Sequence, residues 1–235
     1  MNNSHSAVRF SRIGRHDFFK TLNKRVNEYF KFEKKDKTGN WKLYLKTIIM
    51  FSVFIIPYIL IFFLDTSQWF KLLFAIIIGI GMAGVGMNVM HDGNHGSFSK
   101  KKWVNKLMGS SIYILAGNVY NWKIKHNLLH HTYTNIHGHD EDLEAGRIIR
   151  FSKHSKWLPF HRFQHIYSVF TYGLLTINWA ITSDFITMTK YLKRRLTYKT
   201  ILNPSRLWSI LILTKILYLI IWIIIPYYFL YYFNY

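Results

Sequence analysis

Histidine is concentrated in two short stretches of this 235-residue chain, which contains no cysteine. The first stretch reads HDGNH, from His91 to His95, and the second reads HNLLHHTYTNIHGHDEDLE, from His126 to Glu144. Neutral imidazole nitrogens bind borderline divalent metals such as iron or zinc, whereas the absence of cysteine removes thiolate ligands. The residue types therefore favour a metal site built from nitrogen and oxygen donors.

The spacing of the histidines supports this interpretation. His91 and His95 are four residues apart, as are His126 and His130, so each pair would share one face of a helix. His131 is rotated by about one helical position, and we expect it to point elsewhere, as would suit a second metal. Each side chain taken alone fits a surface histidine equally well, but two clusters on one side of a membrane favour metal binding. The candidate metal ligands are His91, His95, His126, His130 and His131.

The elements that must position these residues are apolar helices. The chain is 50% hydrophobic and 18% aromatic with a formal net charge of +20, a composition that favours a membrane protein over an ordinary soluble domain. The uncharged stretches 47–64 and 72–90 are each long enough to cross ~30 Å of hydrocarbon, and their short link makes them a hairpin. A third span is expected at 207–233. The expected fold class is an all-α integral membrane protein: a transmembrane hairpin, histidine-bearing cytosolic helices and a further C-terminal span.

The distribution of lysine and arginine predicts the orientation. Residues 1–46 and 100–162 are strongly basic, whereas the hairpin tip carries one Asp and one Lys. By the positive-inside rule, the N-terminal segment 1–46 and the histidine-bearing side of the membrane domain, 47–235, should both be cytosolic. Segment 166–188 has basic flanks on both sides, so we expect an interfacial element rather than a fourth span. Because the basic residues alternate with long apolar runs, they do not indicate a nucleic-acid partner.

The histidine stretches also resemble a known family. HDGNH, HNLLHH followed by GHDEDLE, and HRFQHIY at 161–167 are similar to segments of membrane fatty acid desaturases, in the acyl-CoA and acyl-lipid branch that includes linoleoyl-CoA and front-end enzymes. The resemblance implies an oxidoreductase of lipid metabolism that introduces a double bond into an acyl chain with dioxygen. It implies two iron ions held by histidine, an acyl-CoA or acyl-lipid substrate, surrounding membrane lipid, and a separate electron donor such as a ferredoxin or a cytochrome b5 type protein.

Further polar residues are candidates for orienting the metal ligands. Acceptors for imidazole N–H groups could be Asp92, Asp140, Asp142 and Glu144. The alternative for each is an ordinary solvated carboxylate. His161 and His165, again four residues apart, are expected to orient ligands or to contact a headgroup rather than to bind metal.

The sequence departs from the family pattern after the second histidine stretch. The family carries a third histidine box and a further histidine near the end of a last transmembrane helix, but here only His154, His161 and His165 follow. The resemblance therefore implies a C-terminally truncated chain with an incomplete centre. Two alternatives stay open: a catalytically silent membrane protein with the same fold, and a zinc-dependent membrane hydrolase. HDGNH has the spacing of the hydrolase motif HExxH, but Asp92 replaces Glu and Gly93 weakens the helix.

The orientation can be tested by thiol labelling, because the chain has no cysteine of its own. We expect an impermeant maleimide added to intact cells to label Ser67→Cys, at the hairpin tip, and to leave Ser155→Cys unlabelled until the cells are lysed. The charge distribution is the reason, since basic segments are retained in the cytosol. The reverse labelling pattern would overturn the predicted orientation.

Overall fold

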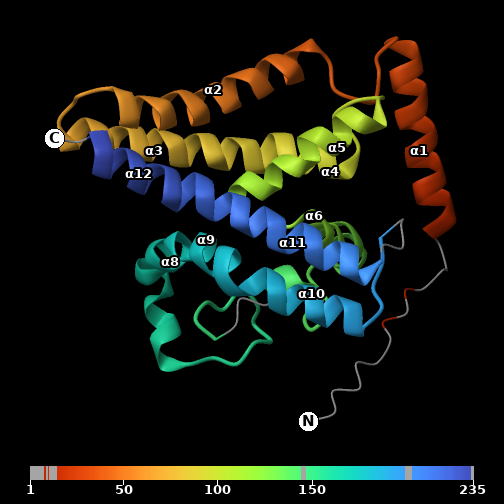
Figure 1. Cartoon of the computed structure of the whole chain (residues 1–235). Coiled ribbons are helices and arrows are strands. Elements are labelled where there is room, and N and C mark those ends of the chain that lie inside the picture. Colours follow the sequence, from red (N-terminus) through yellow and green to blue (C-terminus); the bar gives the residue numbers. More distant parts are fainter. Residues whose placement is uncertain (1–7, 9, 11–14, 144–146, 199–202, 234–235) are drawn as a thin grey trace.

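The computed structural model describes residues 8, 10, 15–143, 147–198 and 203–233, and these residues form helices and loops with no β-strand (Figure 1). This agrees with the all-α fold class expected from the sequence. In chain order the elements are α1 (Arg15–Phe32), α2 (Trp41–Phe63), α3 (Gln68–Gly84), η1 (Val85–Met90), α4 (His91–His95), α5 (Lys102–Ser110), η2 (Ser111–Leu115), α6 (Val119–Trp122), η3 (Lys123–His130), α7 (His131–Tyr133), η4 (Glu141–Leu143), η5 (Pro159–Phe163), α8 (Gln164–Gly173), α9 (Leu175–Asn178), η6 (Trp179–Ser183), α10 (Asp184–Lys193), α11 (Pro204–Leu219), η7 (Ile220–Ile224) and α12 (Ile225–Phe233).

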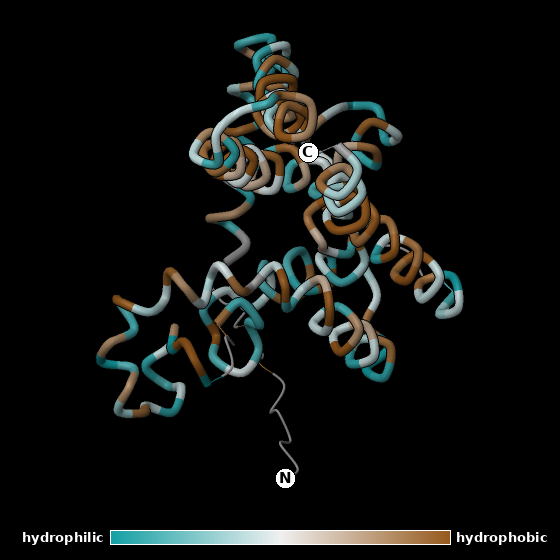
Figure 2. The backbone as a smooth tube through the Cα atoms, turned by 60° about the vertical axis from the view of Figure 1, so that its left-hand side comes forward, coloured by the Kyte–Doolittle hydropathy of each residue, from teal (hydrophilic) through white to brown (hydrophobic). Residues whose placement is uncertain are grey.

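Three helices in the described part of the chain are long and apolar enough to cross a membrane: Trp41–Phe63, Gln68–His95 and Pro204–Tyr232. They include most of the three predicted spans, and each begins a few residues earlier than the apolar run. The first begins at Trp41 because Asn40 caps it, accepting a hydrogen bond from the N–H of Lys42 at 3.0 Å. In Figure 2, apolar residues predominate along much of the helices in the upper part of the view, whereas hydrophilic and apolar residues are more mixed in the lower part.

The predicted hairpin is formed by α2 and α3, which pack closely because of glycines in α3. A Cβ atom at Gly81 would meet the backbone of Phe54, and one at Gly84 would meet the side chain of Met50. Small residues allow such close approach of helices in lipid, where hydrophobic burial alone does not drive association. Gly79, by contrast, faces open space.

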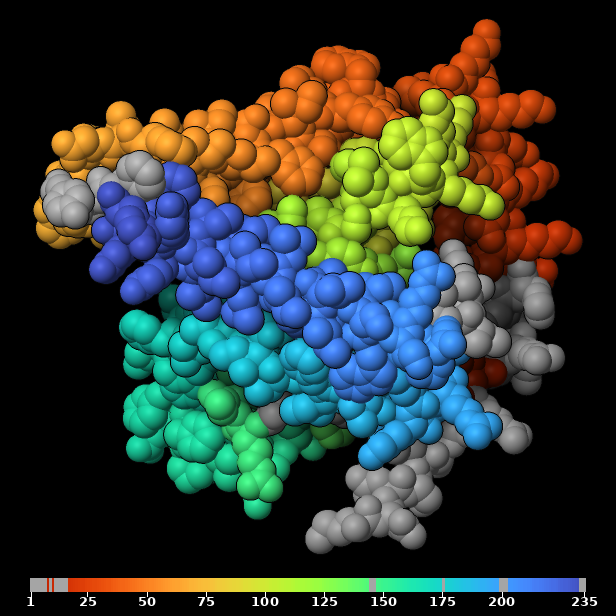
Figure 3. Space-filling model, viewed as in Figure 1, coloured from red at the N-terminus to blue at the C-terminus, as the bar shows by residue number. Residues whose placement is uncertain are grey.

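The third span packs against the hairpin through aromatic side chains. The ring of Trp222, in η7, lies 5.9 Å from Phe54 and 5.4 Å from Tyr58, centroid to centroid. Further along, Phe229 of α12 lies 5.1 Å from Phe62. The third span lies between the hairpin and the group α8 to α10, as the space-filling view shows (Figure 3).

The segment expected to be interfacial, 166–188, forms the bent series α8, α9, η6 and α10. It is not among the candidate spans of the described residues, and its position at the interface stays a prediction. Met188 of α10 forms a buried cluster with Leu207 and Leu211 of α11, and Tyr120 of α6 packs against this cluster. The segment therefore connects the third span to the helix that precedes the second histidine stretch.

Alanine substitutions at two glycines of α3 test the hairpin contact. Gly81→Ala should lower the free energy of unfolding by about 1–3 kcal/mol, because its Cβ would overlap the backbone of Phe54. Gly79→Ala is the matched control, since it adds the same methyl group to the same helix where nothing lies within 4 Å. Thermal unfolding in mild detergent measures both, and equal stability of the two variants would contradict the packing.

Candidate metal centre

The first histidine pair lies at the end of the second predicted span. There α3, the π-helical turn η1 and α4 form one continuous helix from Gln68 to His95. Gly96, with a φ of 80°, ends this helix in the left-handed conformation. The Nε2 atoms of His91 and His95 are 3.2 Å apart. The two imidazoles therefore share one helix face, as their spacing predicts.

Gly93, between these histidines, allows α4 to pack closely on α5. A Cβ atom at this position would meet the backbone of Gly109 and Asn105. The neighbouring Asn94 donates a hydrogen bond from Nδ2 to the carbonyl of Gly109 at 3.0 Å. The glycine that weakens this turn as an isolated helix is thus what permits its tertiary contact.

The second histidine stretch begins within the π-helix η3, which follows α6, and continues through α7 to η4. Asn118 caps α6, because its Oδ1 accepts hydrogen bonds from the N–H groups of Tyr120 at 3.0 Å and Asn121 at 3.2 Å. A π-helix is hydrogen-bonded from i to i+5, so residues five apart approach one another. The ring centroids of His126 and His131 are accordingly 4.9 Å apart.

Four imidazoles from the two stretches converge. Ring centroids lie 5.1 Å apart for His91 and His126, 5.2 Å for His95 and His126, and 5.0 Å for His95 and His131. One nitrogen from each of His91, His95 and His126 lies within 4.8 Å of the other two, so these three could hold a metal ion. The expectation that His131 points elsewhere is wrong, because the wider π-helical turn brings it toward His95 and His126.

His130 instead lies against two aspartates. Its Nδ1 is 3.1 Å from both carboxylate oxygens of Asp140. Asp140 is fully buried and accepts hydrogen bonds from the N–H groups of Asn135 at 2.9 Å and Asp142 at 3.0 Å. A carboxylate fixed in this way can orient an imidazole and leave its Nε2 for a metal, which is the role that the sequence suggested for Asp140.

Asp142 lies beside two of the histidines, with its Oδ2 3.3 Å from Nδ1 of His130 and 3.9 Å from Nδ1 of His126. One of its oxygens and one nitrogen from each of His126 and His130 lie within 4.8 Å of one another, which makes a second possible metal group. The His126 imidazole and the Lys125 ammonium hold the pKa of the Asp142 carboxyl well below its usual range, although burial opposes this. Asp142 therefore remains an anionic oxygen donor and is a candidate ligand.

The protonation of His131 also suits a metal site. Burial and the neighbouring imidazoles of His126, His130 and His91 lower the pKa of His131, which favours its neutral form. Neutral imidazole is the form that binds metal. A donor set rich in nitrogen, with one carboxylate beside it, fits a histidine-held iron centre and would also accept zinc.

Two acidic candidates remain, Asp92 and Glu144. Asp92 places its Oδ1 3.4 Å from Nδ1 of His91, which is a long contact for a hydrogen bond. Glu144 lies outside the described residues.

His161 and His165 are not drawn into the cluster. Nδ1 of His161 accepts a hydrogen bond from the N–H of Leu158 at 3.0 Å, and its Nε2 lies 2.9 Å from the carbonyl of Arg147. Both nitrogens are therefore engaged by the backbone of its own loop, so the expectation that His161 orients a ligand is wrong. His165 is exposed at the beginning of α8, and its suggested headgroup contact stays a prediction.

Trp122 is a residue of the site that sequence reasoning missed. Its ring stacks on His126 at 4.5 Å and lies 5.8 Å from His91 and 5.5 Å from His95. The available signal was its position four residues before His126, which places the two on one helix face. The indole shields one side of the histidine cluster from solvent.

With this geometry in place, the chain can be assigned to a class. It belongs to the fatty acid desaturase family, because the family model described as "Fatty acid desaturase" matches residues 67–234. That region includes both histidine stretches and two of the three candidate spans.

Among curated proteins, the chain is 39% identical to the sn-1 linoleoyl-lipid 6-desaturase of Arthrospira platensis, over 80% of this chain and 50% of that protein. It is 30% identical to the acyl-lipid (8-3)-desaturase of Physcomitrium patens, over 72% of this chain and 36% of that protein. The chain thus spans about half the length, or less, of the curated relatives it matches. No solved structure matches it.

The role of Asp140 can be tested by metal titration. Asp140→Asn should weaken binding of Co²⁺ to the purified chain by about 10–100-fold, because an uncharged acceptor holds the His130 imidazole less firmly. Asp36→Asn is the control, since Asp36 forms an exposed ion pair with Lys100 at 2.5 Å. The visible absorption of bound Co²⁺ measures affinity, and equal affinity in the two variants would contradict the role.

Proposed function

We propose that this chain is part of a membrane fatty acid desaturase that introduces a double bond into the acyl chain of a lipid. The observation that carries the proposal is the convergence of histidines from two stretches, 91–95 and 126–131, at the end of a predicted membrane span. Membership of the desaturase family supports it, as do relatives named for acyl-lipid and linoleoyl-lipid desaturation.

In this proposal the histidine cluster provides ligands for two iron ions. The ligands are His91, His95, His126, His130 and His131, with Asp142 as an added oxygen donor. With dioxygen, bound iron supplies the oxidising power to remove hydrogen from an unactivated methylene group, which side-chain acids and bases cannot do. Asp140 orients His130, and Trp122 limits the access of water to three of the other imidazoles.

The substrate is proposed to reach the cluster from the bilayer. A cavity of about 250 Å³ lies between the second histidine stretch and α10, lined by apolar residues such as Ile112 and Ile186 together with Trp122, Lys125 and Lys190. The apolar part of this lining would accept acyl carbons. Glu141 and Asp184 also line the cavity, and its two lysines are paired with acids, Lys125 with Asp142 at 2.9 Å and Lys190 with Glu141 at 2.6 Å. The cavity touches the histidine cluster through Trp122.

The electron donor and the orientation complete the proposal. We assign electron supply to a separate small redox protein of the ferredoxin or cytochrome b5 type, which would approach the histidine-bearing side. That side is assigned to the cytosol by the basic residues around it.

The alternative functions have less support. A zinc hydrolase of the HExxH type needs a Glu where this chain has Asp92. A catalytically silent protein would have the same fold and histidine cluster, so the difference lies in activity alone.

A chimera tests the proposed activity. This chain would replace the matching half of the Arthrospira desaturase, and fatty acid profiles of the expressing cells would be measured by gas chromatography. We expect a new polyunsaturated species from the chimera. We expect His126→Ala to reduce it to background, because His126 belongs to both possible metal groups.

His154→Ala is the matched control, since His154 is an exposed histidine on the same side of the membrane domain. Its product level should equal that of the unmodified chimera. Undiminished product from the His126→Ala chimera would refute the metal assignment, and no product from a stably expressed chimera would favour a silent protein. Stoichiometric zinc without iron in the purified chimera would favour the hydrolase.

A further inference from the structure

Lys215 is a buried cation in the middle of the third predicted span. It lies within the helix Pro204–Tyr232, and its side chain is 7% exposed. A lysine among membrane-spanning residues is unfavourable unless partners replace its water. Its environment therefore needs a specific explanation.

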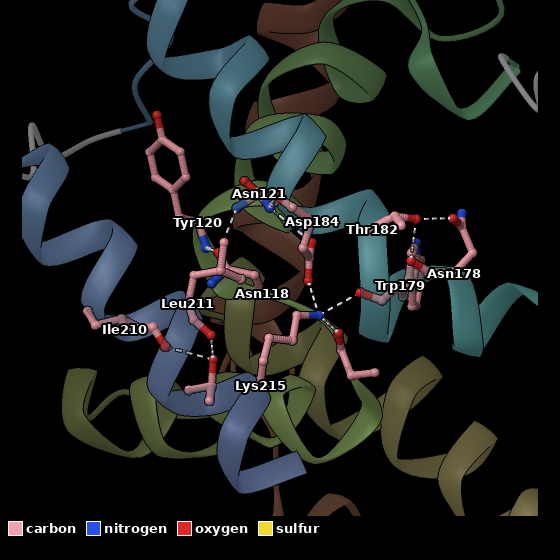
Figure 4. A network of polar contacts seen from close by, with 12 residues as sticks. Asn118, Tyr120, Asn121, Asn178, Trp179, Thr182, Asp184, Ile210, Leu211 and Lys215 are labelled. Carbon is pink, nitrogen blue, oxygen red and sulfur yellow. Dashed lines mark hydrogen bonds and ion pairs between the residues drawn. The ribbon is translucent and has the colours of Figure 1, made fainter. Parts of the chain in front are cut away.

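The ammonium of Lys215 has three oxygen partners, one for each of its N–H bonds. It lies 2.7 Å from Oδ2 of Asp184 and donates to the carbonyl of Trp179 at 2.6 Å and to the carbonyl of Ala116 (Figure 4). Ala116, with a φ of 66°, ends η2 in the left-handed conformation, which turns the chain toward α6. One side chain of α11 is thus bonded to three other parts of the chain.

Asp184 connects Lys215 to α6, the helix that precedes the second histidine stretch. Nδ2 of Asn121 donates to Oδ1 of Asp184 at 2.9 Å and to its backbone carbonyl at 2.8 Å. Asn121 and Asp184 are 4% and 7% exposed. Asn121 immediately precedes Trp122, whose ring stacks on His126. A continuous series of contacts therefore leads from Lys215 to the histidine cluster.

We propose that Lys215, Asp184 and Asn121, together called the Lys215 network, position the second histidine stretch relative to the third span. The inference rests on the proposed function, because it assigns the network a task at the proposed metal centre. None of the three residues belongs to the possible metal groups of the described chain. They act through the position of α6 and η3, and so are positioning residues.

The chemistry of the network favours positioning over simple stabilisation. A buried ion pair often adds little stability compared with apolar side chains of the same size, whereas it specifies one arrangement of its partners. Here the fixed arrangement joins α11 and α10 to the turn before α6. A matched apolar replacement should therefore preserve folding more than it preserves the position of the histidines.

Spin-label distances test this without any metal. The chain has no cysteine, so Thr132→Cys, within the second histidine stretch, and Ser205→Cys, at the beginning of α11, would carry the only labels. Both positions are exposed. We expect one narrow distance distribution in the otherwise unmodified chain. Lys215→Met should broaden it, and Lys215→Arg, which keeps the cation, should restore most of its narrowness.

Binding of Co²⁺ by the same variants, without the labels, links position to the metal centre. Lys215→Met should weaken Co²⁺ binding at least about tenfold, by analogy with residues that orient ligands, and Lys215→Arg should weaken it less. Asp36→Asn, in the exposed ion pair with Lys100, should change neither readout. If Lys215→Met fails to fold, the double variant Lys215→Met with Asp184→Asn, which removes both charges of the buried pair, is used in both measurements instead.

The outcomes separate the two proposals. A folded variant without Lys215 that keeps the narrow distance distribution and the affinity of the parent chain would refute the positioning role. If the parent chain binds no Co²⁺ while the distances still broaden in Lys215→Met, the metal proposal fails and the positioning of the stretch by the Lys215 network stands.

Discussion

The close contact between the two histidine stretches is the constraint on which the candidate centre depends. Asn94 donates to the carbonyl of Gly109, and its own carbonyl accepts a hydrogen bond from Nδ2 of Asn127 at 3.2 Å. Asn94 lies inside the first histidine pair, and Asn127 follows His126 directly. Backbone and amide groups thus hold the imidazoles together, whereas imidazoles alone would repel one another if protonated. Gly93, which lacks a side chain, allows α4 itself to pack closely on α5.

Two of the four π-helical segments in the described part of the chain lie where this site is built. The π-helical turn η1 directly precedes His91, and η3 contains His126 and His130. Each such turn rotates the residues after it relative to a regular helix, at the expense of helical hydrogen-bond geometry. Short π-helical segments are frequent at functional sites for this reason. Here the wider turn of η3 brings His131 into the same cluster as His95.

Polar groups in the membrane domain are tolerated only where the fold supplies partners. Most of the span surface is apolar and faces outward, as many exposed isoleucine, leucine and phenylalanine side chains show. Lys215 and Asp184 are exceptions, and each is charged, buried and bonded to the other. Because an unpaired charge there would be strongly unfavourable, the pair also restricts how α10 and α11 can pack.

The sequence by itself was enough to predict the candidate spans and the candidate metal ligands. Uncharged runs long enough to cross a bilayer form helices because every backbone group must be bonded there, and the spacing of His91 and His95 needs only a regular helix. Tertiary structure decided what depends on packing between distant segments. The contact of His131 with His95, the approach of Asp142 to His126 and His130, and the pairing of Lys215 with Asp184 could not be predicted. Local spacing predicts which residues share a helix face. It does not predict where a π-helical turn will rotate that face, or that Lys215 will pair with a residue 31 positions away.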